Sequence, residues 1–330
     1  MQNCNRMWIA GVVFAAAFFC SYCHAGTVRH DRSPLLHALL ATSPVFDSVA
    51  LVEGQNNSYG YNGSGTLIAP DVVLTAAHIV DEAVSLDVTI DGTTYSADMW
   101  GPFPKWQPNN PFGLIMGYDI GLIHLDTPVA DITPATRYQG KDERGQVAVF
   151  AGYGSTGTGL TGELRYDGVK RVGLNTIDTF FLGNSDTSRI FLADFDNPLR
   201  PSDSLLGSPD PLGLEYLIAS GDSGGPVFLA TDSGLKVAGV HSFGFGLDFI
   251  SDSDYGDITG HTRVTIFNDW INAVLQAFET LPAGSMASDF PLEESLPGFV
   301  RRTRTVPEPT TLLLAAFGAA LILRQKRRHA

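Results

Sequence analysis

The chain has 330 residues, of which 44% are hydrophobic and 17% are charged, and its formal net charge is −14. This composition supports a sizeable core and excludes global disorder, while the negative charge argues against nucleic acid or an anionic lipid surface as a partner. The length fits one large domain or two ordinary ones.

Residues 1–25 have the pattern of a cleaved signal peptide. Arg6 provides a positive start, an apolar stretch runs from Trp8 to Phe19, and Cys23-His24-Ala25 offers a cleavage site. The apolar stretch is too short for a comfortable membrane span, so we expect export rather than anchoring at this end. Every cysteine of the chain lies in this segment, at Cys4, Cys20 and Cys23. The exported protein should therefore contain no disulfide.

Short strand-like runs separated by turn residues dominate the chain from Val45 to about residue 266. Residues 54–65 predict a hairpin loop, and the polar residues 27–44 predict no strand. The Pro-rich residues 101–113, with Trp100 beside them, predict a surface insertion, and residues 183–215 predict long loops. Helical periodicity is convincing only from Phe267 to Phe278, where the apolar residues share one face.

Three polar residues stand out within specific local patterns. His78 ends the segment Leu74-Thr75-Ala76-Ala77-His78, and Asp119 begins Asp119-Ile120-Gly121-Leu122. Ser223 lies in Gly221-Asp222-Ser223-Gly224-Gly225, where glycines permit a tight turn that leaves the serine uncovered. A serine hydroxyl becomes a nucleophile when a neighbouring base takes its proton, so this set predicts nucleophilic catalysis.

The three segments together resemble the trypsin/chymotrypsin-like serine peptidases, and the chain order His, Asp, Ser is the one that this family uses. The resemblance implies an all-β fold of two packed antiparallel β-barrels with a C-terminal α-helix. We expect a peptidase domain over residues 26–280, with barrels at about 45–145 and 146–266 and a closing helix at 267–278. The absence of cysteine from this domain departs from the family.

The resemblance also implies the role of each residue in the site. His78 would act as the base, Asp119 would orient it, and the N–H groups of Gly221 and Ser223 would form the oxyanion hole. Substrate-binding positions would be the edge-strand residues Ser242, Phe243 and Gly244, the pocket floor Leu217 and the pocket wall Thr259. An apolar floor predicts cleavage after small or medium apolar residues and no tryptic activity.

One family feature is missing from the sequence. In the family, the mature N-terminus commonly inserts and pairs with the acid before the serine, which is Asp222 here. We find no suitable small apolar pair near residues 27–41. Because an unpaired buried carboxylate is costly, we expect Asp222 to have another partner.

Two further motifs suggest ligands but are weak. Gly152, Gly154 and Gly157 match a dinucleotide fingerprint, but no helix start follows them, so we expect no cofactor. The acidic residues within 248–257 could attract cationic side chains or weakly bind calcium, but a solvated loop is the simpler interpretation, and we expect no metal.

The C-terminus resembles a PEP-CTERM sorting signal of Gram-negative bacteria. After a linker at 281–306, residues 307–330 contain Pro307-Glu308-Pro309, an apolar run and the basic cluster Arg324-Gln325-Lys326-Arg327-Arg328. The resemblance implies an exosortase-type processing enzyme as partner, transient membrane contact and a mature protein outside the cell. A plain C-terminal anchor is the alternative.

The sequence therefore predicts a monomeric, secreted or surface-sorted serine endopeptidase that acts on protein or peptide substrates. A catalytically idle homologue that serves as an extracellular matrix or binding module is the main alternative. An esterase would share the nucleophile but not this order of segments.

Overall fold

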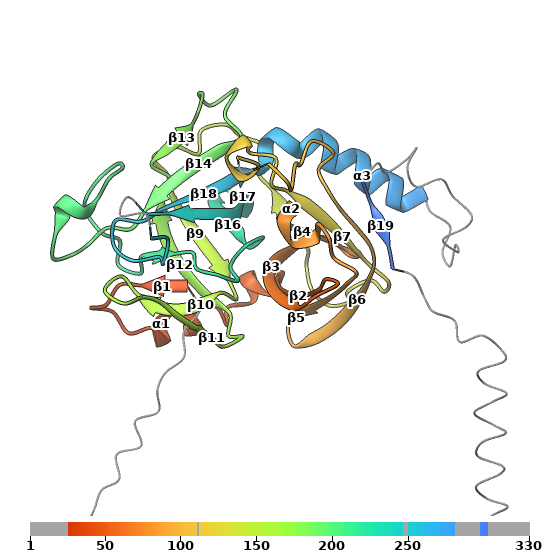
Figure 1. Ribbon diagram of the computed structural model, residues 1–330, viewed down its shortest axis with the longest axis horizontal. Coiled ribbons are helices and arrows are strands. Elements are labelled where there is room, and N and C mark those ends of the chain that lie inside the picture. Colours follow the sequence, from red (N-terminus) through yellow and green to blue (C-terminus); the bar gives the residue numbers. More distant parts are fainter. Residues whose placement is uncertain (1–25, 111, 247–249, 281–297, 303–330) are drawn as a thin grey trace, which may run out of the picture.

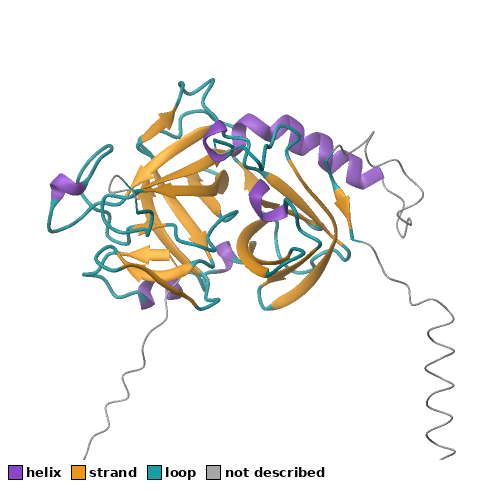
Figure 2. Cartoon of the chain, viewed as in Figure 1, coloured by secondary structure: helices purple, strands orange, loops and turns teal. Residues whose placement is uncertain are grey.

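The computed structural model describes residues 26–110, 112–246, 250–280 and 298–302 (Figure 1). The predicted signal peptide and sorting segment lie outside these residues. Two groups of strands lie side by side, and a helix runs along one edge of them (Figure 2). No helix in the described ranges is long and apolar enough to cross a membrane.

Six antiparallel strands form the group called here the first barrel. They are β2 (Val49–Gln55), β3 (Gly60–Ala69), β4 (Val72–Thr75), β5 (Ser85–Ile90), β6 (Thr93–Pro102) and β7 (Gly121–Leu125). They pair in the order β6-β5-β2-β3-β4-β7, and pairing of β6 with β7 closes the barrel. In β5, every second residue is buried, which is the alternation expected of a strand with one face on a core.

Twelve further strands form two sheets, called here the second module. Eight strands form the larger sheet: β8 (Thr136–Arg137), β9 (Val147–Gly152), β12 (Arg171–Thr176), β13 (Thr179–Phe181), β14 (Ile190–Asp194), β16 (Pro226–Thr231), β17 (Gly234–Phe245) and β18 (Ile258–Arg263). The smaller sheet contains β1 (Gly26–Val28), β10 (Ser155–Thr158), β11 (Gly162–Tyr166) and β15 (Tyr216–Leu217). The larger sheet bends back so that β12 lies close to β14, and the Asn175 side chain on β12 donates to Asp194 O on β14 at 2.9 Å.

The described residues contain three α-helices, α1 (Leu35–Leu40), α2 (Ala77–Val80) and α3 (Asn268–Thr280). The predicted closing helix is confirmed as α3, which begins one residue later than expected because Phe267 ends a preceding 3-10 turn. Its residues Ile271, Val274 and Phe278 are buried. Phe278 packs against His124 of β7, so α3 covers the first barrel.

Two segments expected to lack strands contain them. Residues 27–28 belong to β1, which lies between β10 and β15 and is fully buried. Within 183–215, all five residues of β14 are buried. Both strands are short and lie among turn-forming residues, and each pairs with a strand far away in the chain, β1 with β10 and β15 and β14 with β18. β10 follows Gly154 directly, so a strand and not a helix follows the first two glycines of the Gly152, Gly154 and Gly157 motif.

The predicted surface insertion and linker also contribute to the core. Trp100 is fully buried on β6, and Phe103 packs against Trp270 of α3. Within the predicted linker, β19 (Val300–Arg301) pairs with β6, and Phe299 packs against Phe278. The chain thus returns to the first barrel just before the predicted sorting motif.

Candidate active site

His78 and Asp119 meet at the edge of the first barrel. His78 lies on α2 directly after β4, and Asp119 lies two residues before β7. His78 Nδ1 is 2.8 Å from Asp119 Oδ2, and the backbone N–H of His78 donates to Asp119 Oδ1 at 2.9 Å. Asp119 is fully buried, whereas the His78 side chain is 29% exposed. An acceptor carboxylate on Nδ1 fixes the tautomer that leaves Nε2 free to act as a base.

The second module holds Asp119 from the other side. Ser242 Oγ on β17 donates to Asp119 Oδ2 at 2.5 Å, and Thr262 Oγ1 on β18 donates to the Asp119 carbonyl at 2.9 Å. Burial disfavours the charged form of His78, but the charge and hydrogen bond of Asp119 outweigh it and raise the His78 pKa above its ordinary value. Ser242 thus makes in the structure the contact with Asp119 that the family resemblance implied.

Ser223 lies on the turn before β16, and contacts from both the first barrel and the second module hold this turn in place. Ser64 N donates to Ser223 O at 2.7 Å, and Gly224 N donates to His241 O at 2.8 Å. Gly224 has a φ of +86°, and a Cβ there would lie 2.1 Å from Thr75 Oγ1. Only glycine fits this close approach, which explains the residue that follows the predicted nucleophile.

The backbone around Ser223 leaves two amide donors available. Gly221 has a φ of +97°, and its carbonyl accepts from Ser64 Oγ at 2.9 Å. Within the described part of the chain, the N–H groups of Gly221 and Ser223 donate no hydrogen bond. The same set of residues contains no hydrogen bond between His78 Nε2 and Ser223 Oγ, a contact that is often loose without substrate.

Asp222 has partners, as its predicted burial required. Its fully buried carboxylate accepts hydrogen bonds from Gly154 N at 2.8 Å, Ala219 N at 2.9 Å and Tyr216 Oη at 2.9 Å. Burial raises the pKa of Asp222 to about 6, and these three donors limit the rise. The sequence did not identify Tyr216, because its role depends on the tertiary fold.

The N-terminal strand covers Tyr216. β1 pairs with β15, which carries Tyr216, and a Cβ on Gly26 would lie 2.0 Å from the Tyr216 ring. The side chain of Tyr216 is fully buried. The first described residues of the chain therefore pack over the phenol that binds Asp222.

The predicted substrate-binding residues divide into two groups. Phe243 is half-buried and Gly244 is exposed on β17, near the Ser242 that contacts Asp119. Leu217 and Thr259 are almost completely buried. Thr259 Oγ1 donates to Ala193 O at 3.4 Å and lies 3.1 Å from His261 Nε2. The first group faces solvent beside the site, whereas the second lies beneath the surface.

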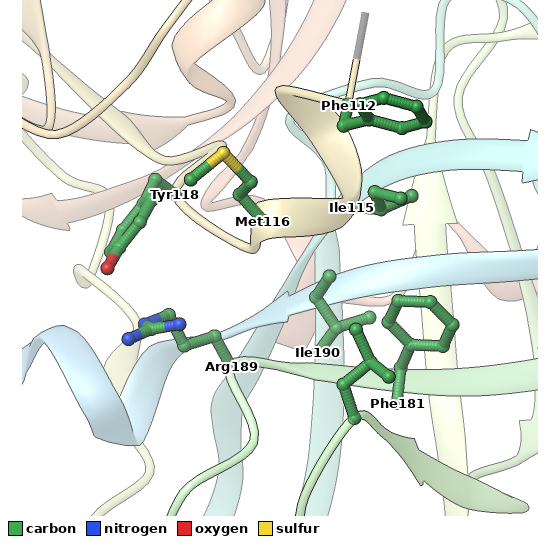
Figure 3. Close-up of a pocket in the computed structure, with 8 residues that line it drawn as sticks. Phe112, Ile115, Met116, Tyr118, Phe181, Arg189 and Ile190 are labelled. Carbon is green, nitrogen blue, oxygen red and sulfur yellow. The ribbon is translucent and has the colours of Figure 1, made fainter. Parts of the chain in front are cut away.

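A pocket of about 260 Å³ lies between the two strand groups (Figure 3). It is lined by Phe112, Ile115, Met116, Tyr118, Phe181, Leu182, Arg189 and Ile190. Tyr118 directly precedes Asp119, and the guanidinium of Arg189 lies 4.4 Å from the centre of its ring. The pocket is largely apolar and has a cation at its edge.

The acidic loop brings three carboxylates together. Ligand oxygens of Asp252, Asp254 and Asp257 lie within 4.8 Å of one another. Asp257 is buried and accepts a hydrogen bond from Ser253 N at 2.8 Å. At least this carboxylate therefore supports the backbone of its own loop.

Two family models match the chain. The model described as Trypsin matches residues 47–271, and the model of the PEP-CTERM protein-sorting motif matches residues 305–328. The first match contains His78, Asp119 and Ser223. The second covers the segment in which the sequence predicted a sorting signal.

A curated relative and two solved structures support the same comparison. Brachyurin from Leptuca pugilator is 30% identical over 218 residues, which are 64% of this chain and 86% of brachyurin. The fold is similar to HL collagenase, with a TM-score of 0.51, 20% identity and coverage of 71% of this chain and 95% of the other. The fold is also similar to neuropsin, a serine protease of mouse brain, with a TM-score of 0.52 and 17% identity. This match covers 71% of this chain and 96% of neuropsin. The predicted chymotrypsin-like fold is confirmed.

Proposed function

Because the chain belongs to the trypsin family of serine peptidases and carries a PEP-CTERM sorting motif, we propose that it hydrolyses proteins outside the cell with His78, Asp119 and Ser223 as its catalytic triad. Membership of the family makes it a serine-type endopeptidase. The observation that carries the triad assignment is the His78–Asp119 pair, buried on the Asp119 side and braced by Ser242.

The geometry supports a two-stage reaction. His78 Nε2 takes the Ser223 proton while Ser223 Oγ attacks the peptide carbonyl, and Asp119 stabilises the imidazolium that forms. The N–H groups of Gly221 and Ser223 stabilise the oxyanion, each such donor being worth about 3 kcal/mol. His78 then protonates the leaving amine, and water hydrolyses the acyl-enzyme on Ser223 by the same steps in reverse.

Substrate selection follows from the polarity around the site. We propose that an extended peptide pairs with the backbone of Phe243 and Gly244. The buried Leu217 offers no partner for a guanidinium, so apolar residues should precede the scissile bond. Phe243 belongs to the same apolar cluster as Phe181 and Ile190, which line the 260 Å³ pocket. Apolar side chains further upstream in the peptide should therefore also bind.

Sorting and partners follow from the two ends of the chain. The sorting motif supports export to the cell surface, and we propose cleavage of residues 1–25 followed by exosortase-type processing near Pro307. Before processing, the C-terminal segment would contact the membrane of a Gram-negative bacterium. We propose that the processed peptidase acts as a monomer.

The test is digestion of a peptide library by the mature protein beside its Ser223→Ala variant. We expect a loss of turnover of about 10⁶-fold in the variant, as in other triads, and cleavage after small or medium apolar residues in the wild type. Activity near that of the wild type in Ser223→Ala would refute the triad. Cleavage mainly after Arg or Lys would refute only the role of Leu217.

Labelling of the same mature protein with a fluorophosphonate distinguishes an active peptidase from a catalytically idle homologue. An active enzyme reacts with a fluorophosphonate at Ser223 and loses that reaction in Ser223→Ala and His78→Ala. A folded wild type that shows no labelling would support a binding module instead.

A further inference from the structure

Two histidines lie side by side in the core, behind the turn that carries Ser223. His241 on β17 and His261 on β18 are cross-strand partners, and both are fully buried. Their Nδ1 atoms are 3.0 Å apart, which is a hydrogen-bond distance. Since an N–H must face a lone pair, one Nδ1 carries a proton and the other does not. Two neutral imidazoles satisfy this bond, and so does one imidazolium with one imidazole, so the burial of the rings decides between the two states.

The surroundings of the pair offer no counter-ion. Phe150 of β9 packs against both rings, with centroid distances of 5.1 and 4.7 Å, and Phe191 of β14 lies 5.4 Å from the His261 ring. Gly225 faces His241 from the turn before β16. Among the described residues, no carboxylate contributes to the pKa shift of either histidine, and the titratable group bonded to each ring is the other histidine.

The outer ring nitrogens also disfavour a second proton. His261 Nε2 lies 3.1 Å from Thr259 Oγ1, whereas the buried His241 Nε2 has no hydrogen-bond partner among the described residues. Burial lowers the pKa of His241 to about 3, opposed by the carbonyl of Ala151, and burial together with His241 lowers the pKa of His261. A charged ring could not be neutralised where it lies.

The pair is connected to the proposed catalytic residues through the backbone. His241 O accepts from Gly224 N and His241 N donates to Gly225 O, both at 2.8 Å, so His241 holds the two residues after Ser223. The residues that follow the two histidines, Ser242 and Thr262, both donate to Asp119. The register of β17 against β18 at this pair thus determines both ends of the triad.

We propose that His241 and His261 form an acid-sensitive lock that positions the Ser223 turn while both rings are neutral and releases it when one ring is protonated. A further proton has two places to go. On the accepting Nδ1 it sets an N–H against an N–H and breaks the bond between the rings, and on the free Nε2 of the donating ring it leaves a buried charge without a counter-ion. The charged ring then has to move toward water, and β17 cannot keep its bonds to Gly224 and Gly225. The inference rests on the proposed triad only for its effect on activity.

Protonation of His78 would also abolish activity at low pH, but it is reversed faster than the opening of the lock. His78 is partly exposed and bonded to Asp119, so it loses its extra proton as soon as the pH is raised. Re-forming the lock requires two strands and a turn to return to register. After a jump from pH 3 to pH 7.5, labelling of Ser223 by a fluorophosphonate should therefore recover with a lag.

The first measurement uses the mature wild-type protein labelled with ¹⁵N. We expect one Nδ1–H signal from the pair at neutral pH. On acidification it should disappear with the same midpoint as the shift of the Gly224 amide, whose bond to His241 O is the contact that opens. A Gly224 amide that is unchanged when the pair titrates would overturn the proposal. This readout needs no activity, so it tests the lock even if Ser223 proves unreactive and the proposed function fails.

The second measurement compares variants after the acid jump. His241→Phe combined with His261→Phe removes both titrating rings, and we expect labelling without a lag. His37→Phe, which replaces a buried histidine elsewhere in the second module, should keep the lag. A lag that persists in the double variant, or its absence from the wild type, would contradict the lock. If the double variant does not fold, the Gly224 amide decides.

Discussion

The first barrel and the second module are closed by different interactions. Backbone pairing of β6 with β7 completes the first barrel, and Asp119 is the charged residue buried at its edge. The second module has no such closing pair between β12 and β14 among its described strands. It buries many charged or titratable side chains instead: Arg29, Glu143, Arg171, Asp194, Asp196, Glu215, Asp222, His241, His261 and Arg263.

Because of this difference, we expect the two halves of the molecule to differ in how strongly they respond to pH and to mutation. An apolar core with a complete backbone ladder loses little when the pH changes, so the first barrel can hold His78 and Asp119 steadily. Buried polar groups are stable only while each keeps its partner and protonation state. The second module, which carries Ser223 and the proposed substrate strand, should therefore respond more strongly to mutation and pH.

The largest expected effect is the loss of the ion pair between Arg263 and Glu143. Both side chains are fully buried, with contacts of 2.9 and 2.7 Å, and Arg263 also donates to Ser188 O at 2.7 Å. Arg263→Met leaves a buried carboxylate without its partner, so we expect a loss of about 3–5 kcal/mol in the free energy of unfolding. Urea denaturation measures it.

Two further variants make this comparison specific. Arg302→Met removes an ion pair on the first barrel in which both side chains are at least 30% exposed, so it should cost about 1 kcal/mol or less. Arg263→Met combined with Glu143→Leu should regain much of the lost stability, because no unpaired charge remains. Equal losses in Arg263→Met and Arg302→Met would contradict the contrast between the two halves.

The second prediction concerns Tyr216, which binds Asp222 beside the nucleophile. Tyr216→Phe removes one hydrogen bond to a buried charged group, which should cost about 1.5–3 kcal/mol of stability. Because Asp222 precedes Ser223, kcat should fall more than KM changes. Tyr138→Phe, which removes a bond to the exposed Asp142, is the matched control. Unchanged kcat in Tyr216→Phe would mean that the two amide donors suffice to hold Asp222.

The sequence predicted the parts of the site that are encoded locally. His78, Asp119 and Ser223 each lie in a distinctive segment, and the small residues around them are required by close backbone contacts such as that of Gly224. The closing helix was predictable because its apolar face repeats within one segment. These features depend on neighbours in the chain.

The missed features depend on contacts that no local sequence pattern encodes. β1 is only three residues long and is stabilised between β10 and β15, more than 120 residues away. Tyr216 resembles any apolar strand residue until the fold places Asp222 within 2.9 Å of its hydroxyl. His241 likewise matched an ordinary strand residue, since nothing local indicates that His261 faces it.

The third prediction concerns pH and Glu215. Burial raises the pKa of Glu215 to about 8 from an ordinary value of 4.5. A raised pKa in the folded state means that the stabilisation is complete below pH 4.5 and is lost as the pH rises toward 8, at about 1.4 kcal/mol per pH unit. This loss of stability lowers the melting temperature as the pH rises, and Glu215→Gln should make that decrease smaller. Glu53→Gln, on the exposed surface of the first barrel, should leave it unchanged. A slope equal to that of the wild type in Glu215→Gln would assign the decline to other groups.

The smallest expected effect is that of a reductant, because neither half contains a cysteine once residues 1–25 are removed. A native disulfide is typically worth about 2–5 kcal/mol, which corresponds to a shift of several degrees in melting temperature. The two halves are joined instead by contacts such as those of Ser64, whose Oγ donates to Gly221 O and whose N–H donates to Ser223 O. Dithiothreitol does not act on these bonds, so the melting temperature of the mature protein should not change.

A disulfide-bonded protein heated in the same buffer verifies that the reductant is active. A decrease of several degrees would show that Cys20 or Cys23 remains in the mature chain, and mass spectrometry of its N-terminus would then locate the true cleavage site.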